Sequence, residues 1–243
     1  MSRGIAAVRS TGATRFPLRG AAAKVALPAG RRCGAPRFCP FLGRPIAPMS
    51  ASLPPPGARL MMILPPQGVA DLGACLDAGD VAAVIWRGPP PADQVAEAQR
   101  RDVAALAEGG ARAAVEGLDG AHVGDPAALK AALSALKPDA IVGAGGLTDR
   151  HEAMVAGESG ADYVLFGDLA GAAGSFPRTL DLAAWWAEVF EVPCVGVATS
   201  LDEVEALARA GVDFVALAGP LLDAGQGPAN VAAAMARIAE AGA

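Results

Sequence analysis

Aromatic residues, cysteines and long apolar runs are all scarce in this 243-residue chain. Four cysteines are too few for a disulfide-rich scaffold. No window of about 20 residues is uninterrupted by polar residues, which argues against a membrane-spanning helix. Hydrophobic residues nevertheless make up 53% of the chain, and its mean hydropathy is +0.36. This composition excludes a mainly disordered protein and is typical of an α/β protein whose sheet is buried on both faces.

Acidic residues are absent from residues 1–58, which carry nine arginines and lysines. The remaining 185 residues hold 11 basic and 25 acidic residues, a net charge of −14. The sequence Pro54-Pro55-Pro56-Gly57 marks the junction between the two parts. We therefore expect residues 1–58 to be a basic, disordered N-terminal extension and residues 59–243 to be the folded domain.

Three interpretations of the basic extension remain open. It resembles a targeting segment because it is rich in arginine and lacks acidic residues. A nucleic-acid or lipid-binding arm would also be basic, but its charges would be clustered, whereas these arginines are scattered. The third interpretation is an upstream extension of a protein that begins at Met49 or Met61.

From Arg59 onward, short apolar runs alternate with alanine-rich amphipathic stretches. The runs predict strands at 60–64, 81–86, 120–123, 140–142, 163–166, 194–197 and 214–217. The stretches predict helices at 68–78, 93–108, 126–136, 149–158, 179–190, 201–210 and 228–241. This alternation favours a (β/α)8 TIM-type barrel with one strand–helix unit reduced or missing. A doubly wound open sheet is the alternative.

A repeated unit favours the barrel over the open sheet. The sequence of residues 160–166, Gly-Ala-Asp-Tyr-Val-Leu-Phe, resembles that of residues 211–217, Gly-Val-Asp-Phe-Val-Ala-Leu. In each copy the glycine ends a helix, the aspartate lies in a turn and an apolar strand follows. We interpret Asp162 and Asp213 as structural because they precede the strands.

Functional residues are expected at the carboxyl ends of the strands, where barrel enzymes place their active sites. The chain's two histidines, His122 and His151, both fall at this end, although a lone histidine is often structural. The glycines in Gly143–Leu147 would let backbone N–H groups approach an anion. Spacings typical of zinc sites are absent. Cys75 and Cys194 lie in apolar runs, which indicates buried thiols in a reducing compartment.

Three stretches of the sequence resemble a known protein family. These are residues 141–154 (Ile-Val-Gly-Ala-Gly-Gly-Leu-Thr-Asp-Arg-His-Glu-Ala-Met), residues 160–167, and the pair Trp185-Trp186 followed by Val192-Pro193-Cys194. They resemble the thiamine phosphate synthase/TenI family, and the resemblance covers about 59–243. It implies a (β/α)8 barrel that couples a hydroxymethylpyrimidine pyrophosphate to a thiazole phosphate with Mg²⁺ and releases pyrophosphate. The TenI members isomerise a thiazole or lack synthase activity.

The family's motifs are only partly retained. Of the Gln-x-Arg-x-Lys that grips pyrophosphate after the second strand, only Arg87 remains. We expect the third strand, which carries the family's Asn-Asp-Arg and its metal-binding aspartate, to be deleted, because the chain runs almost directly from Glu108 to Gly120. Of His-Leu-Gly-Gln-x-Asp, His122 and Gly124 remain. The Thr-Thr-Lys loop after the sixth strand is replaced by the segment beginning at Asp168.

From the resemblance and the strand ends together, we expect catalysis by His122, Asp125 and Asp168, with Mg²⁺ held by Asp125. The residues expected to bind substrate or phosphate are Arg87, Gly124, Gly145, Gly146, Arg150, His151, Thr199, Ser200 and Gly219. Arg87 and the two histidines should share one cavity.

The predicted function is a cytoplasmic, thiamine phosphate synthase-like transferase of thiamine biosynthesis. A non-catalytic barrel that binds phosphorylated ligands is the alternative, and another phosphate-handling barrel enzyme is a weaker one. The expected partners are small phosphorylated substrates and a second copy of the chain, without nucleic acid or membrane.

Overall fold

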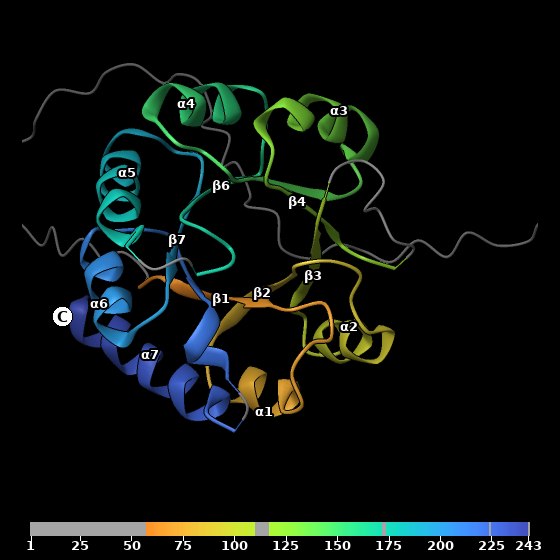
Figure 1. Ribbon diagram of the computed structural model, residues 1–243, viewed down its shortest axis with the longest axis vertical. Coiled ribbons are helices and arrows are strands. Elements are labelled where there is room, and N and C mark those ends of the chain that lie inside the picture. Colours follow the sequence, from red (N-terminus) through yellow and green to blue (C-terminus); the bar gives the residue numbers. More distant parts are fainter. Residues whose placement is uncertain (1–56, 110–116, 172–173, 224, 243) are drawn as a thin grey trace, which may run out of the picture. The chain divides into compact units, whose positions relative to one another are not determined.

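The computed structural model describes residues 57–109, 117–171, 174–223 and 225–242. Its strands are β1 (Arg59–Leu64), β2 (Val81–Trp86), β3 (Ala104–Glu108), β4 (Gly120–Val123), β5 (Ile141–Ala144), β6 (Tyr163–Phe166), β7 (Cys194–Ala198) and β8 (Phe214–Leu217). All neighbouring pairs are parallel and follow chain order, and β8 pairs with β1 to close the barrel (Figure 1). The predicted TIM-type barrel is confirmed, and the open sheet is excluded.

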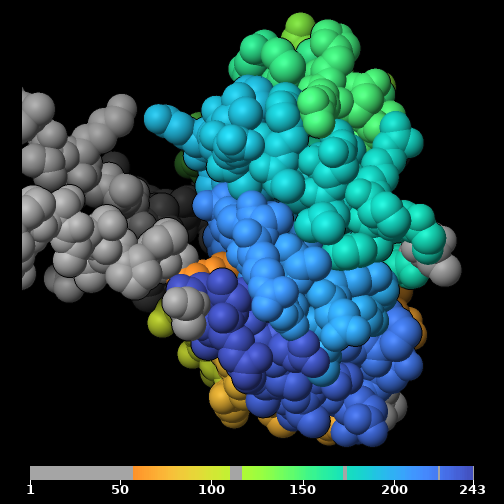
Figure 2. Space-filling view, turned by 90° about the vertical axis from the view of Figure 1, so that its left-hand side faces the viewer, coloured from red at the N-terminus to blue at the C-terminus, as the bar shows by residue number. Residues whose placement is uncertain are grey.

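Helices surround the barrel. They are α1 (Leu72–Asp77), α2 (Ala92–Gln99), α3 (Pro126–Leu136), α4 (Arg150–Glu158), α5 (Phe176–Val189), α6 (Leu201–Arg209), the 3₁₀ helix η2 (Gly219–Leu222) and α7 (Gly227–Ala241). Figure 2 shows α5, α6 and α7 side by side on one face of the molecule. Of the described helices, none is long and apolar enough to cross a membrane. The predicted extension lies outside the described residues except for Gly57 and Ala58.

The predicted loss of the third strand is wrong. β3 pairs with β2 through residues 104–107 and with β4 through residues 106–108. The helix predicted over 93–108 ends at Gln99, and the chain turns at Asp102, whose φ of 57° lies in the left-handed region. Of the connection from β3 to β4, residues 110–116 lie outside the described residues.

Inward-facing side chains fill the barrel in layers. The interior cluster includes Met61, Ile63, Ala83, Ile85, Leu106, Tyr163, Leu165, Val195, Val197, Ala216 and Ala218. Because side chains on a strand alternate between faces, the next inward positions along β2, β3, β4 and β7 are Arg87, Glu108, Gly124 and Thr199. The apolar core therefore ends below a polar layer at the carboxyl ends of the strands.

Because Gly143 has no side chain, the Tyr163 ring can lie directly against its backbone inside the barrel. A Cβ at Gly143 would lie 2.0 Å from Cζ of Tyr163. We expect Gly143→Ala to lower the free energy of unfolding by about 1–3 kcal/mol, because a buried ring must move. Urea unfolding at constant m-value measures this change. Gly124→Ala is the matched control, since its Cβ would meet only Oε1 of Glu108, at 3.5 Å; equal losses in the two variants would refute the explanation.

Candidate functional site

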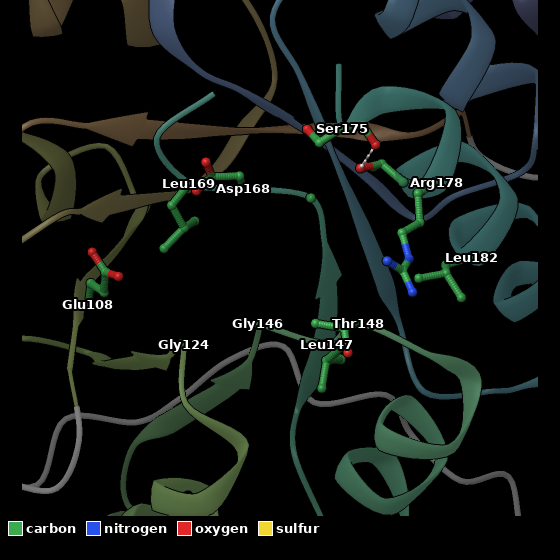
Figure 3. A pocket seen from close by; sticks show the side chains of 12 residues that line it. Glu108, Gly124, Gly146, Leu147, Thr148, Asp168, Leu169, Ser175, Arg178 and Leu182 are labelled. Carbon is green, nitrogen blue, oxygen red and sulfur yellow. Dashed lines mark hydrogen bonds between the residues drawn. The ribbon is translucent and has the colours of Figure 1, made fainter. Parts of the chain in front are cut away.

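The pocket that we call the Arg178 pocket lies at the carboxyl ends of β3, β4, β5 and β6 and has a volume of about 300 Å³. Its lining includes Glu108, Gly124, Gly146, Thr148, Asp168, Leu169, Ser175 and Arg178. Figure 3 shows Glu108 and Asp168 on one side of this pocket and Arg178 on the other. The pocket therefore holds two carboxylates that face one guanidinium.

The floor of the Arg178 pocket depends on a close approach between two loops. Gly146 has a φ of 67°, and a Cβ there would lie 2.0 Å from the carbonyl oxygen of Gly124. Beyond it, the Asp149 side chain caps α4 by accepting a hydrogen bond from the N–H of Glu152 at 2.8 Å. Glu152 in turn accepts hydrogen bonds from both the N–H and the hydroxyl of Thr148. These bonds join the β5–α4 loop to the start of α4, and the N–H of Gly145 donates to the carbonyl oxygen of Val123 at the end of β4.

The loop from β6 to α5 carries Asp168 and leads to Arg178. Gly167 adopts a φ of 110°, and Oδ1 of Asp168 accepts a hydrogen bond from the N–H of Ala170 at 2.9 Å. Helix α5 then begins at Phe176 with a proline in its first turn. Arg178 follows in that turn, where its side chain is exposed at the pocket.

A second pocket, which we call the Arg87 pocket, lies near the ends of β1, β2 and β8 and has a volume of about 350 Å³. Arg87 and Gly219 line it together with apolar residues such as Ile63 and Leu222. Leu169 lines both the Arg87 pocket and the Arg178 pocket. The two pockets are therefore neighbours that share one side chain.

Thr199 lines a third, smaller pocket, which it shares with Asp168. Its N–H and hydroxyl both donate to Oε2 of Glu203, at 2.6 and 2.9 Å. The Ser200 side chain caps α6 by accepting a hydrogen bond from the N–H of Glu203. Both predicted phosphate ligands thus use side-chain groups to fix the start of α6.

His122 lies inside the barrel, fully buried, and outside the lining of these three pockets. Its Nδ1 is 3.0 Å from the Tyr163 hydroxyl, and the two rings stack with centroids 5.8 Å apart. Burial lowers the pKa of His122 to about 4 and raises that of Tyr163, so both side chains are neutral near pH 7. Nε2 has no hydrogen-bond partner among the described residues, and a Cβ at Gly145 would lie 2.4 Å from it.

The cavity expected to be shared by Arg87, His122 and His151 is not present: Arg87 lines its own pocket, His122 is buried, and His151 is exposed on α4. Arg150 lies 5.0 Å from the ring centroid of Trp185 and pairs with Asp181 at 3.6 Å. These contacts draw its guanidinium towards α5.

Asp125 is exposed, and its Oδ1 caps α3 by accepting a hydrogen bond from the N–H of Ala127 at 2.9 Å. It does not line any of the three pockets. Gly124, Gly146 and Asp168, by contrast, come together at the Arg178 pocket. The roles predicted for all these residues stay predictions.

Arg87 and Arg178, near the carboxyl ends of the strands, differ from the other described arginines in their ion pairing with carboxylates. Within the described part of the chain, six arginines form ion pairs with carboxylates: Arg59, Arg100, Arg101, Arg150, Arg209 and Arg237. Among the same described residues, Arg87 and Arg178 form none, and each lines a pocket. Two guanidinium groups are therefore available to an anionic ligand at the carboxyl ends of the strands.

Glu108 and Arg178 are the charged residues of the Arg178 pocket that the sequence analysis missed. The signal for Glu108 was its place directly after an apolar run, but that run was assigned to a helix. The signal for Arg178 was a cation after a proline at a helix start, a pattern that many surface helices share.

Comparison with known proteins identifies the family. The family model described as thiamine monophosphate synthase matches residues 72–221. A thiamine-phosphate synthase of Rhodospirillum centenum is 38% identical over 74% of this chain and 97% of its own length, and one of Hyphomonas neptunium is 35% identical over 72% and 91%. The fold resembles a thiamine phosphate pyrophosphorylase from Pyrococcus furiosus, with a TM-score of 0.60 and 18% identity over 75% of this chain and 96% of that one. The chain therefore belongs to the thiamine monophosphate synthase family.

Proposed function

We propose that this protein is a thiamine-phosphate synthase that joins a hydroxymethylpyrimidine diphosphate to a thiazole phosphate. The observation that carries the proposal is the pair of neighbouring pockets, each with an arginine that lacks a carboxylate partner among the described residues. The reaction has two anionic substrates that must meet, and the pockets adjoin at Leu169. The relatives named thiamine-phosphate synthase support the same function.

The reaction requires the protein to stabilise a leaving group rather than to move a proton. The thiazole ring nitrogen forms a bond to the pyrimidine methylene carbon as the bond from that carbon to the diphosphate oxygen breaks. The electron pair of the broken bond leaves with diphosphate, and the thiazolium keeps the positive charge. Fixed cations that face the developing negative charge lower the barrier. In the proposal, the arginines that line the two pockets supply this positive charge.

The proposal includes Mg²⁺, because the Arg178 pocket contains carboxylates that could bind it. No group of three His, Cys, Asp or Glu side chains that could hold a metal occurs within the described ranges. Mg²⁺, however, is often held by one or two carboxylates together with substrate phosphates and water. Glu108 and Asp168 supply two carboxylates in one pocket, so they fit this pattern better than Asp125. When bound, the ion would neutralise charge on the diphosphate.

The other predicted residues keep narrower roles in the proposal. Gly124 and Gly146 shape the floor of the Arg178 pocket, and Gly219 shapes the Arg87 pocket. His122 acts from inside the barrel by holding Tyr163 and supporting the Gly145 backbone rather than by touching substrate. A cytoplasmic, reducing location fits the two buried thiols, Cys75 and Cys194.

The full chain tests the proposal when it is incubated with both substrates and MgCl2 and the product is separated and identified by mass. We expect thiamine phosphate and diphosphate to form in equal amounts. Omission of either substrate is the control. If no product forms but either substrate raises the melting temperature, the non-catalytic binder replaces the synthase. That alternative is favoured by the loss of the glutamine and lysine that flank Arg87's position in the family motif.

A further inference from the structure

The first turn of α5 presents a cation to the pocket that contains the two carboxylates. Arg178 is exposed there and, within the described residues, forms no ion pair. The neighbouring helix offers a contrast, because Arg150 of α4 is held by Trp185 and Asp181. An arginine at a barrel mouth that no described side chain neutralises has its full charge available for a ligand.

The charged side chains that line the Arg178 pocket indicate which kind of anion it binds. Glu108 and Asp168 repel a bare phosphate on one side, while Arg178 attracts it on the other (Figure 3). A diphosphate can bind to both sides of the pocket. One of its phosphates can share a divalent cation with the two carboxylates, while the other accepts hydrogen bonds from the guanidinium. A monophosphate has fewer oxygens with which to serve both sides.

We propose that Arg178 binds the diphosphate group of the pyrimidine substrate and stabilises it as it leaves. This inference rests on the proposed function. Arg178 would compensate for the lysine that the loop after β6 lacks, because α5 places a guanidinium beside the loop that carries Asp168. Arg87 remains available from β2 for the same group or for the thiazole phosphate.

Steady-state kinetics of Arg178→Ala test the assignment. We expect kcat/KM for the pyrimidine diphosphate to fall about 100-fold or more, in the range found when one stabilising donor is removed. KM for the thiazole phosphate should change less than threefold. Arg178→Lys should recover part of the loss, because a lysine keeps the charge but loses the bidentate geometry. Arg209→Ala is the matched control, since it removes an exposed guanidinium that pairs with Glu205 on α6.

A binding experiment separates failure of this inference from failure of the proposed function. Inorganic pyrophosphate with MgCl2 is titrated calorimetrically into the full chain, and Arg178→Ala should weaken its binding at least tenfold. If the wild-type chain makes no thiamine phosphate, the proposed function fails and the diphosphate assignment is judged by this titration alone. Unchanged pyrophosphate binding in Arg178→Ala overturns the inference. So does an active variant in which only the thiazole phosphate KM has risen.

Discussion

Replacing Glu108 by glutamine is expected to lower kcat/KM for thiamine phosphate formation by about 100- to 1000-fold. Glu108 ends β3 and lines the Arg178 pocket, where it is one of two carboxylates. Glutamine keeps the size of the side chain but removes the charge that a magnesium–diphosphate pair would need. We also expect the Mg²⁺ concentration for half-maximal rate to rise, because a neutral amide is a weaker ligand for this hard cation.

Two measurements check the Glu108 prediction without relying on turnover alone. The Mg²⁺ dependence of the rate is compared among the wild type, Glu108→Gln and Glu188→Gln, which changes an exposed acid on α5 away from the pocket. The melting temperature with pyrophosphate is then recorded with and without MgCl2. The extra stabilisation by MgCl2 should disappear only in Glu108→Gln. If that variant keeps wild-type kcat/KM and Mg²⁺ dependence, Glu108 is not part of the metal site.

The missed strand shows why sequence patterning failed at this point. Residues 104–108 are Ala-Ala-Leu-Ala-Glu, which favour a helix and contain no β-branched side chain. They also follow α2 after only four residues, so the helical pattern runs on without a break. The segment is extended because β2 and β4 leave a gap that only a paired strand can close. Tertiary hydrogen bonding overrides local propensity here, and the pocket carboxylate was lost from the prediction with the strand.

The repeated unit was predictable because its signals are local. Asp162 accepts a hydrogen bond from the N–H of Val142 at 2.7 Å, and Asp213 accepts one from the N–H of Cys194 at 2.9 Å. Each aspartate thus ties its own turn to the start of a neighbouring strand, in agreement with the structural role that the sequence indicated. The helices predicted at 126–136 and 201–210 also begin where expected, because Asp125 and Ser200 cap them and a capping side chain acts within three residues.

The site was less predictable because it depends on where loops direct their side chains. Arg150 and His151 follow a glycine-rich loop, a sequence arrangement typical of phosphate sites. Trp185 and Asp181 on α5 nevertheless hold the Arg150 guanidinium, and these residues lie about 30 positions later in the chain. Arg178 lines the pocket instead, since α5 begins beside the loop that follows β6. Contacts between separate helices therefore determine which arginine side chain lines the pocket. Such contacts join residues far apart in the chain, so they are not apparent from a single sequence.

The buried His122 should make the barrel less stable in acid. Its pKa is about 4 in the native state against about 6.5 in the unfolded chain. As the pH falls below 6.5, the unfolded state therefore binds a proton that the native state excludes, and the free energy of unfolding decreases. The loss amounts to about 3 kcal/mol at pH 4, while well above pH 6.5 His122 contributes no pH dependence.

Urea unfolding between pH 7.5 and 4.5 measures this effect. His122→Asn removes the titrating ring but keeps a polar group for the Tyr163 hydroxyl, so its stability should fall less steeply than that of the wild type. His151→Asn is the matched control, because it makes the same substitution at the chain's other histidine, which is exposed, and leaves the buried His122 ring in place. Carboxylates titrate in all three chains, so only the difference in slope reports on the histidine. Parallel profiles for His122→Asn and the wild type would show that protonation of His122 is not what destabilises the barrel in acid.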